Sequence, residues 1–224
     1  AKIEGVDVIL GAQKKGLLLQ EVQKIESERN FGNAKMILDV EDIEKVSSVY
    51  SAFSSGERTR SFLKVQDGCD YKCSYCTIPK ARGKSRNLSI AELVEQAHQI
   101  ASLGIKEIVL TGVNIGDFGR TTGESFLELL KQLNEVEGIE RYRISSIEPN
   151  LLTREIVEWI ASGTKFLPHF HIPLQSGCDE ILRRMRRRYN TAMFAEKIEL
   201  VREYMGNPFF GIDVITGFPG ETEE

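Results

Sequence analysis

The sequence predicts an α/β protein in which parallel strands alternate with helices. Two observations carry this prediction. Short apolar or β-branched runs recur along the chain, and most are followed by a helical pattern of apolar residues; the 41% hydrophobic and 28% charged residues also match a globular protein. Strands that alternate with helices form parallel βαβ units with right-handed crossovers. The pattern alone does not separate an open doubly wound sheet from a barrel, but in both folds ligands bind at the carboxyl ends of the strands.

The alternation is sparse before residue 60 and regular after it. The first part predicts a strand at 6–10, a helix at 13–28, a strand near 35–40 and a linker at 41–60. Later strands are predicted at 62–66, 106–111, 141–146, 167–174 and 209–216, and helices at 90–103, 125–135, 153–161, 179–188 and 192–204. Ser89 with Glu92, and Ser125 with Glu128, have the spacing of a capping box, which marks the starts of two of these helices.

Three of the four cysteines lie in one short stretch, directly after the strand predicted at 62–66. Cys69, Cys73 and Cys76 have the spacing C-x3-C-x2-C, and Cys178 stands alone. Disulfide frameworks use paired cysteines spread through short secreted chains, so this pattern favours a reducing compartment, which we expect to be the cytoplasm, and a metal site. Structural zinc usually draws four ligands as two pairs. Three thiolates on a [4Fe–4S] cube leave one iron open for a small molecule.

Two alternatives to an iron–sulfur site stay open at this point: a zinc ion completed by a distant histidine, and buried cysteines that bind no metal. Cys178 is expected to have a packing or capping role at the start of a helix. His169 and His171 are two residues apart on a predicted strand and so share one face, where we expect hydrogen-bonded core histidines rather than catalysts.

The net charge of −4 means that any contact with nucleic acid depends on local basic patches. One patch follows the cysteines, and a second crowds the end of the helix predicted at 179–188; the alternative for both is a solvated surface. Their members are Lys80, Arg82, Lys84 and Arg86 in the first and Arg183, Arg184, Arg186, Arg187 and Arg188 in the second. No apolar run is long enough to span a bilayer and no secretion signal is present, so no membrane association is expected.

The motif Cys69-x3-Cys73-x-Tyr75-Cys76 resembles that of the radical S-adenosylmethionine (SAM) superfamily. The segments CSYCTIPKARG at 73–83, LQSG at 174–177 and ITGFPGET at 215–222 are similar to methylthiotransferases. RISSIEP at 143–149 and HFHIP at 169–173 most resemble the branch that acts on threonylcarbamoyladenosine in tRNA.

The resemblance implies a partial parallel (β/α)6 TIM-like barrel with five of its six strands present in this chain. Residues 61–224 would form this radical SAM core, truncated at its carboxyl end, and residues 1–40 would be the remnant of an α/β N-terminal methylthiotransferase domain, joined by the linker at 41–60. Because the chain starts at Ala1 and stops at Glu224, we expect a fragment cut at both ends. The family's second cluster, held by three upstream cysteines, and its C-terminal RNA-binding domain would then lie outside it.

The implied reaction is methylthiolation of C2 of threonylcarbamoyl-modified adenosine at position 37 of tRNA. SAM would serve as both the radical source and the methyl donor. An electron from the reduced cluster, supplied by a low-potential flavodoxin or ferredoxin, would cleave SAM to a 5′-deoxyadenosyl radical that removes hydrogen from the base. The partner would be the tRNA anticodon loop, whose unstacked bases can be splayed into a pocket. Alternatives are isopentenyladenosine tRNA or a ribosomal-protein aspartate as substrate, and a non-catalytic zinc or electron-transfer module.

The resemblance also assigns site residues, none of them as an acid or base. Cys69, Cys73 and Cys76 would bind the cluster. The expected SAM contacts, apart from the aromatic residue before the third cysteine, follow the carboxyl ends of successive strands. They are Tyr75, Thr111, Gly112, Asn114, Ser146, Glu148, Gln175, Ile215 and Gly217.

Overall fold

The computed structural model describes residues 6–30, 37–39, 42–47, 49–50, 52–54 and 59–222. The main body is built on parallel strands whose spatial order follows the sequence. Strands β3 (Ser61–Lys64), β6 (Glu107–Thr111) and β7 (Arg141–Ile144) pair in the order β3-β6-β7, and β8 (His169–His171) pairs with β9 (Phe209–Gly211). The parallel bridges Tyr142–Phe166 and Ser146–His171 join the two groups. The α/β prediction is therefore confirmed, and the order is consistent with a partial barrel.

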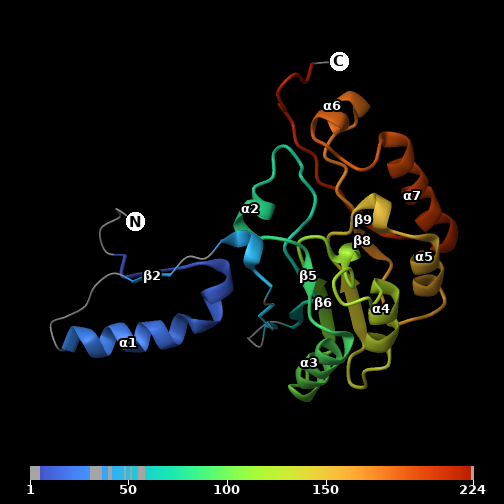
Figure 1. Cartoon of the computed structure of the whole chain (residues 1–224). Helices are drawn as coiled ribbons and strands as arrows, with labels where there is room; N and C mark the ends of the chain where they lie inside the picture. Colours follow the sequence, from blue (N-terminus) through green and yellow to red (C-terminus); the bar gives the residue numbers. More distant parts are fainter. Residues whose placement is uncertain are drawn as a thin grey trace.

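Helices pack around these strands (Figure 1). They are α3 (Ile90–Ser102), α4 (Phe126–Asn134), α5 (Arg154–Ala161), α6 (Asp179–Arg184) and α7 (Thr191–Tyr204). Ser89 and Glu92 form both halves of the predicted capping box. At α4 only half forms, because Ser125 accepts from the Glu128 amide while the Glu128 carboxylate accepts from Gln132 at 2.9 Å instead.

The core lies between the strands and the inner faces of the helices. Strand side chains alternate between this core and the opposite face, as the period of two requires. The fully buried members include Leu63, Leu110, Tyr142 and Phe170 on strands and Leu93, Ile100, Leu129 and Leu133 on helices. The carboxyl ends of the strands are thereby fixed next to one another, and this is where the predicted site residues fall.

Several predicted strands are shorter than expected, and the last two of the main body are shortened most. The strand predicted at 167–174 is β8, His169–His171, and the one at 209–216 is β9, Phe209–Gly211. Pro173 lacks the amide hydrogen that a continuing ladder needs, which accounts for the early end of β8. Pairing resumes after it as a single parallel bridge between Gln175 and Val214.

The N-terminal part contains its own small parallel pair, β1 (Val8–Leu10) with β2 (Ile37–Asp39), and Figure 1 shows it to one side of the main body. The helix predicted from residue 13 starts as a 3-10 helix, Ala12–Leu17, and becomes α1 at Leu18–Asn30. Gly16 has low helix propensity and packs against the Tyr50 ring, where a Cβ would meet Cδ1 at 2.7 Å. In the predicted linker, Ile43–Lys45 forms a 3-10 turn. The strand near 35–40 is confirmed over 37–39; its other positions lie outside the described residues.

A loop leaves the sheet just beyond the carboxyl end of β3 and carries the three clustered cysteines. The two-residue strands β4 (Gln66–Asp67) and β5 (Arg86–Asn87) pair antiparallel and close its base, and α2 (Ile78–Arg82) lies within it. We call residues 68–85 the cysteine loop. None of the helices in the described part of the chain has the length and apolar character needed to cross a membrane.

Candidate functional site

The three clustered cysteines line one cavity of about 580 Å³. Cys73 is buried and Cys69 and Cys76 are half-buried. The turn that presents them is held by two backbone amides: Tyr71 donates to Cys69 Sγ at 3.4 Å, and Cys76 donates to the Cys73 carbonyl at 3.1 Å. Cys178 is exposed and does not line this cavity. The structure thus brings together the three cysteines that the sequence grouped.

The surroundings of Cys69 and Cys73 favour the neutral thiols when no metal is bound. Burial raises the pKa of Cys69 to about 11; the Tyr71 amide opposes this, and the nearby Cys73, Glu148 and Asp117 add to it. Burial also raises the pKa of Cys73. A metal that binds thiolates here must therefore displace protons.

The ligand set bears on which metal fits. Among the described residues, no three His, Cys, Asp or Glu side chains are arranged to share a single metal ion. Structural zinc usually has four protein ligands around one ion. Three thiols spaced around a shared cavity suit a cluster in which each sulfur binds a different iron.

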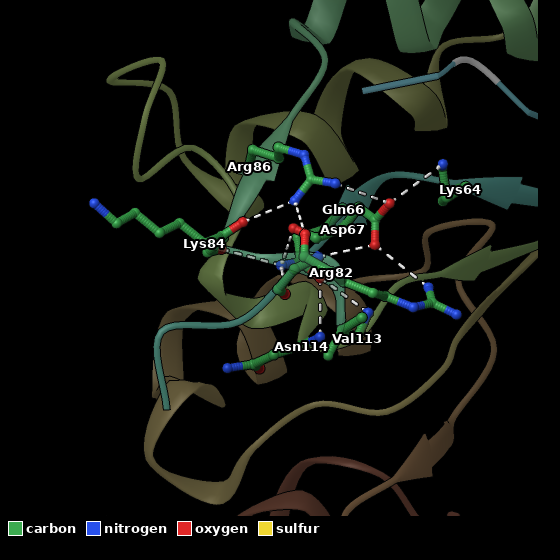
Figure 2. Close-up of polar contacts among 10 residues, drawn as sticks. Lys64, Gln66, Asp67, Arg82, Lys84, Arg86, Val113 and Asn114 are labelled. Atoms are coloured by element: carbon green, nitrogen blue, oxygen red, sulfur yellow. Dashed lines mark hydrogen bonds and ion pairs between the residues drawn. The ribbon is translucent and has the colours of Figure 1, made fainter. Parts of the chain in front are cut away.

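Gln66 ties the cysteine loop to the segment that follows β6 (Figure 2). Its side-chain amide nitrogen donates to the Gly68 carbonyl at 2.7 Å and to Ser85 Oγ at 3.0 Å. Its side-chain oxygen accepts from the backbone amides of Val113 and Asn114, both at 2.9 Å. One buried side chain therefore fixes the base of the loop against residues where SAM contacts were expected.

Asp67 neutralises part of the predicted basic patch from inside the protein (Figure 2). Its buried carboxylate pairs with Arg82 and Arg86 at 3.3 Å each and with Lys64 at 3.7 Å. Arg86 is buried, so the expectation that it faces RNA is wrong. Lys80 and Lys84, by contrast, are exposed and line the cysteine cavity.

The segment after β6 contains polar atoms that lack a partner within the described residues. Thr111 Oγ1 donates to the Leu63 carbonyl at 3.2 Å. The side-chain nitrogen and oxygen of Asn114, and Oδ2 of Asp117, are buried without any hydrogen bond there. An unsatisfied buried polar group costs about 1–3 kcal/mol, so these atoms fit a site completed by a polar ligand. Gly112 leaves no space for a Cβ, which would meet Ile115 Cγ2 at 2.7 Å.

Glu148 and Tyr75, both expected to contact SAM, share a protein partner, Arg187. The guanidinium pairs with the Glu148 carboxylate and donates to the Tyr75 hydroxyl at 3.2 Å and to Cys73 Sγ at 3.0 Å. Sequence reasoning placed Arg187 only in a basic patch, and no signal distinguishes it there from the four other arginines nearby.

The other predicted contacts lie near the ends of β7 to β9 or in the segments after them. Ser146 forms the bridge to His171, and Gln175 takes a positive φ of 67° while its carbonyl accepts from the Ile215 amide at 2.8 Å. Gly217 is exposed, also with positive φ. These contacts place Ser146 beside His171 and Gln175 beside Ile215.

The remaining candidates have structural explanations. His171 forms the expected hydrogen bond, with Asp213 at 2.9 Å, but its side chain is 33% exposed, so its expected place in the core is wrong. His169 stacks on Phe209 with ring centroids 5.0 Å apart, and its Nδ1 has no partner in the described structure. Cys178 occupies the N-cap position of α6, but its side chain makes no capping bond, so a capping role for the thiol is wrong.

Most arginines of the second basic patch contact other side chains of this chain. Arg183 and Arg184 pair with Glu180 at 2.7 and 2.9 Å, and the Arg188 guanidinium lies 3.8 Å from the centroid of the Tyr71 ring. The Arg187 guanidinium makes the contacts with Glu148, Tyr75 and Cys73 described above. Arg186 lines the cysteine cavity with Lys80 and Lys84, so exposed cations from both patches meet at that cavity.

The sequence is similar to that of a known superfamily and of tRNA-modifying enzymes. Residues 63–224 match the radical SAM superfamily. The threonylcarbamoyladenosine tRNA methylthiotransferase MtaB of Bacillus subtilis is 39% identical over 99% of this chain and 49% of its own length. A tRNA-2-methylthio-N(6)-dimethylallyladenosine synthase of Wolinella succinogenes is 36% identical over 88% of this chain and 48% of its own length. The chain thus spans about half the length of the curated relatives that it matches.

Solved structures agree on the fold. The radical SAM methyltransferase TsrM of Kitasatospora setae, with cobalamin and a [4Fe-4S] cluster bound, superposes with a TM-score of 0.58 at 18% identity. The match covers 72% of this chain and 32% of that one. At this identity the likeness concerns the arrangement of strands and helices alone.

Proposed function

Because the chain belongs to the radical SAM superfamily, we propose that it is the core of a methylthiotransferase that acts on C2 of threonylcarbamoyl-modified adenosine at position 37 of tRNA. The observation that carries the proposal is the convergence of Cys69, Cys73 and Cys76 on one cavity. Membership of the superfamily implies a [4Fe–4S] cluster and SAM. The three thiols fit the cluster, because they leave one iron corner without a protein ligand.

The residues of this chain would hold and orient the two cofactors. The thiolates of Cys69, Cys73 and Cys76 would bind the cluster, and the cluster would supply the electron that cleaves SAM. Asn114, whose buried amide lacks a partner among the described residues, and the backbone at Gly112 offer polar contacts to SAM. The fold positions these groups and excludes water, which is the usual share of a protein in cofactor chemistry.

The exposed cations at the cavity support RNA as the substrate. Lys72, Lys80, Lys84 and Arg186 line it with the cysteines, although the chain carries net negative charge. Contacts with phosphates supply much of the affinity of proteins for nucleic acids. We assign these side chains to the backbone of the anticodon loop. A flavodoxin or ferredoxin would deliver the electron, and tRNA as substrate places the reaction in the cytoplasm.

The choice of threonylcarbamoyladenosine rests on the relatives. Four proteins named for that substrate are 36–39% identical to this chain and cover 98–100% of it. Relatives named for dimethylallyladenosine also match, at 32–36% identity. The substrate is therefore tested separately from the radical chemistry.

Anaerobic reconstitution tests the chemistry. We expect about four irons and four sulfides per chain in the cysteine loop, with cleavage of SAM to 5′-deoxyadenosine. Cys73→Ala should abolish both while Cys178→Ala, the control, retains them. Binding of zinc alone, with SAM left intact, would overturn the proposal.

The substrate requires the full-length protein and a strain that lacks it. Mass spectrometry of tRNA nucleosides from that strain should show loss of the methylthio group on threonylcarbamoyladenosine, restored by the wild-type gene. If methylthio-modified threonylcarbamoyladenosine persists in that strain, and the methylthio group is lost from isopentenyladenosine or from a ribosomal protein instead, the substrate assignment is wrong. The radical chemistry then stands.

A further inference from the structure

The segment 184–187, which begins at the last residue of α6, contacts three successive residues of the cysteine loop. The Ser74 amide donates to the Met185 carbonyl at 3.1 Å, and Ser74 Oγ donates to the Arg184 carbonyl at 2.9 Å. Arg187 contacts the residues on either side of Ser74, namely Cys73 and Tyr75. The middle of the cysteine loop is thus anchored by a segment more than 100 positions away in the sequence.

Arg187 is the most enclosed part of this contact. Its side chain is only 3% exposed and that of Glu148 is 13% exposed. The Arg187 Nε donates to the Tyr189 hydroxyl at 3.2 Å, and that hydroxyl donates to the Pro173 carbonyl at 2.6 Å. The contacts with Glu148 and Tyr189 fix the orientation of the planar guanidinium, and in this orientation its Nη1 points at the sulfur of Cys73.

The guanidinium remains charged in this setting. A guanidinium is not deprotonated in proteins, and this one pairs with the Glu148 carboxylate. A permanent cation and an N–H donor therefore face a sulfur that the proposed function makes a cluster ligand. Hydrogen bonds to ligand sulfurs and local charge are among the factors that set the reduction potentials of iron–sulfur clusters.

We propose that Arg187 is a positioning residue for the cluster: it holds Cys73 Sγ in place and, through the N–H···S bond, raises the reduction potential of the cluster which that sulfur binds. The inference rests on the proposed function. Its physical basis is that the reduced cluster carries one more negative charge, so a donor aimed at its ligand stabilises the reduced state more than the oxidised state. Tyr75 then supports the cluster indirectly, as a hydrogen-bond acceptor for Arg187.

The test separates the hydrogen bond from the charge. Arg187→Met combined with Glu148→Gln removes one positive and one negative charge, so the local net charge is unchanged while the N–H···S bond is lost. Arg187→Lys keeps the charge but cannot reach Cys73, Tyr75 and Glu148 together. Arg183→Gln is the control, because Arg183 is exposed and pairs with Glu180.

Each protein is reconstituted anaerobically, and the potential of its cluster is measured without SAM by a redox titration followed by electron paramagnetic resonance. We expect the double variant to show about a tenfold smaller equilibrium constant for one-electron reduction, which corresponds to a potential about 59 mV more negative. Arg187→Lys should fall between it and the wild type, and Arg183→Gln should match the wild type.

Each outcome has a defined meaning. If the wild type binds no cluster, the proposed function fails before the inference is reached. If either Arg187 variant carries a cluster with the wild-type potential, the inference is overturned. Loss of the cluster from both variants with native circular dichroism supports the role in holding Cys73, whereas loss of native circular dichroism in both makes Arg187 merely structural and overturns it.

Discussion

Replacing Gly68 with alanine should destabilise the chain much more than the same change at Gly104. Both glycines have positive φ, 71° and 79°, and an alanine there costs about 1–2 kcal/mol of backbone strain. The surroundings differ. A Cβ on Gly68 would overlap the Lys84 carbonyl, lying 2.6 Å from its carbon, and would lie 2.7 Å from Arg86 Nη1, whereas a Cβ on Gly104 has nothing within 4 Å.

The expected difference follows from what must move. Relieving the overlap displaces the Lys84 carbonyl, which accepts from Arg86 Nη1 at 2.9 Å. Overpacking costs about 1–3 kcal/mol, and a hydrogen bond lost to a charged group costs about 1.5–3 kcal/mol. We therefore expect Gly68→Ala to lower the free energy of unfolding by about 3 kcal/mol or more beyond the loss at Gly104.

Urea unfolding measures this directly, because the chain has one tryptophan, Trp159, which is half-buried against the core and reports on its loss. The two variants are compared with the wild type at one temperature and pH. Equal losses at Gly68 and Gly104 would refute the argument, since they would show that the cysteine loop yields to the extra carbon without cost.

Two further predictions concern ionisation. Burial acts to raise the pKa of Glu107, but hydrogen bonds from Arg143 at 2.8 Å and Arg141 at 3.1 Å lower it overall; this stabilisation is complete above the unfolded pKa of about 4.3 and is lost as pH falls through the lower folded pKa. Glu107→Gln should therefore lower the free energy of unfolding by about 1–3 kcal/mol at pH 7. The difference between variant and wild type should narrow below about pH 4.3. A difference of the same size at pH 3, measured by urea unfolding, would contradict this. In the metal-free protein, iodoacetamide should modify the exposed Cys178 before Cys69, whose pKa of about 11 leaves little thiolate at pH 7; peptide mapping that finds Cys69 alkylated first would be the contrary result.

Most of the fold could be predicted from local patterns in the sequence. The alternation of strands and helices needs only the apolar periodicity of each segment, and the capping box of α3 needs only two residues three positions apart, Ser89 and Glu92. The clustering of the cysteines is local in the same way. These features were predictable because their physical causes lie within a few residues of chain.

The wrong predictions concern residues whose partners could not be read from the sequence spacing. Glu128 had the right spacing for a capping box, yet Gln132, one turn later, competes for its carboxylate. Arg86 looked like a surface cation, but the pairing of β4 with β5 places it beside Asp67. Arg187 resembled its neighbours, and only the packing of α6 against the cysteine loop distinguishes it. In each case the deciding partner is chosen by folding rather than by spacing.

The three contacts that hold the cysteine loop also show why a cysteine motif alone does not define such a site. Gln66 fixes the base of the loop to the segment after β6, and Asp67 binds cations from α2 and β5. Arg187, which follows α6, joins the middle of the loop to Glu148, which follows β7. Holding three sulfurs in one arrangement restricts backbone freedom at a cost of about 1–2 kcal/mol per residue. Since the buried polar contacts offset that cost before any metal arrives, the arrangement of the sulfurs depends on residues outside the motif. A chain with the same cysteine spacing but without these contacts would have to order the loop at the expense of its affinity for the cluster.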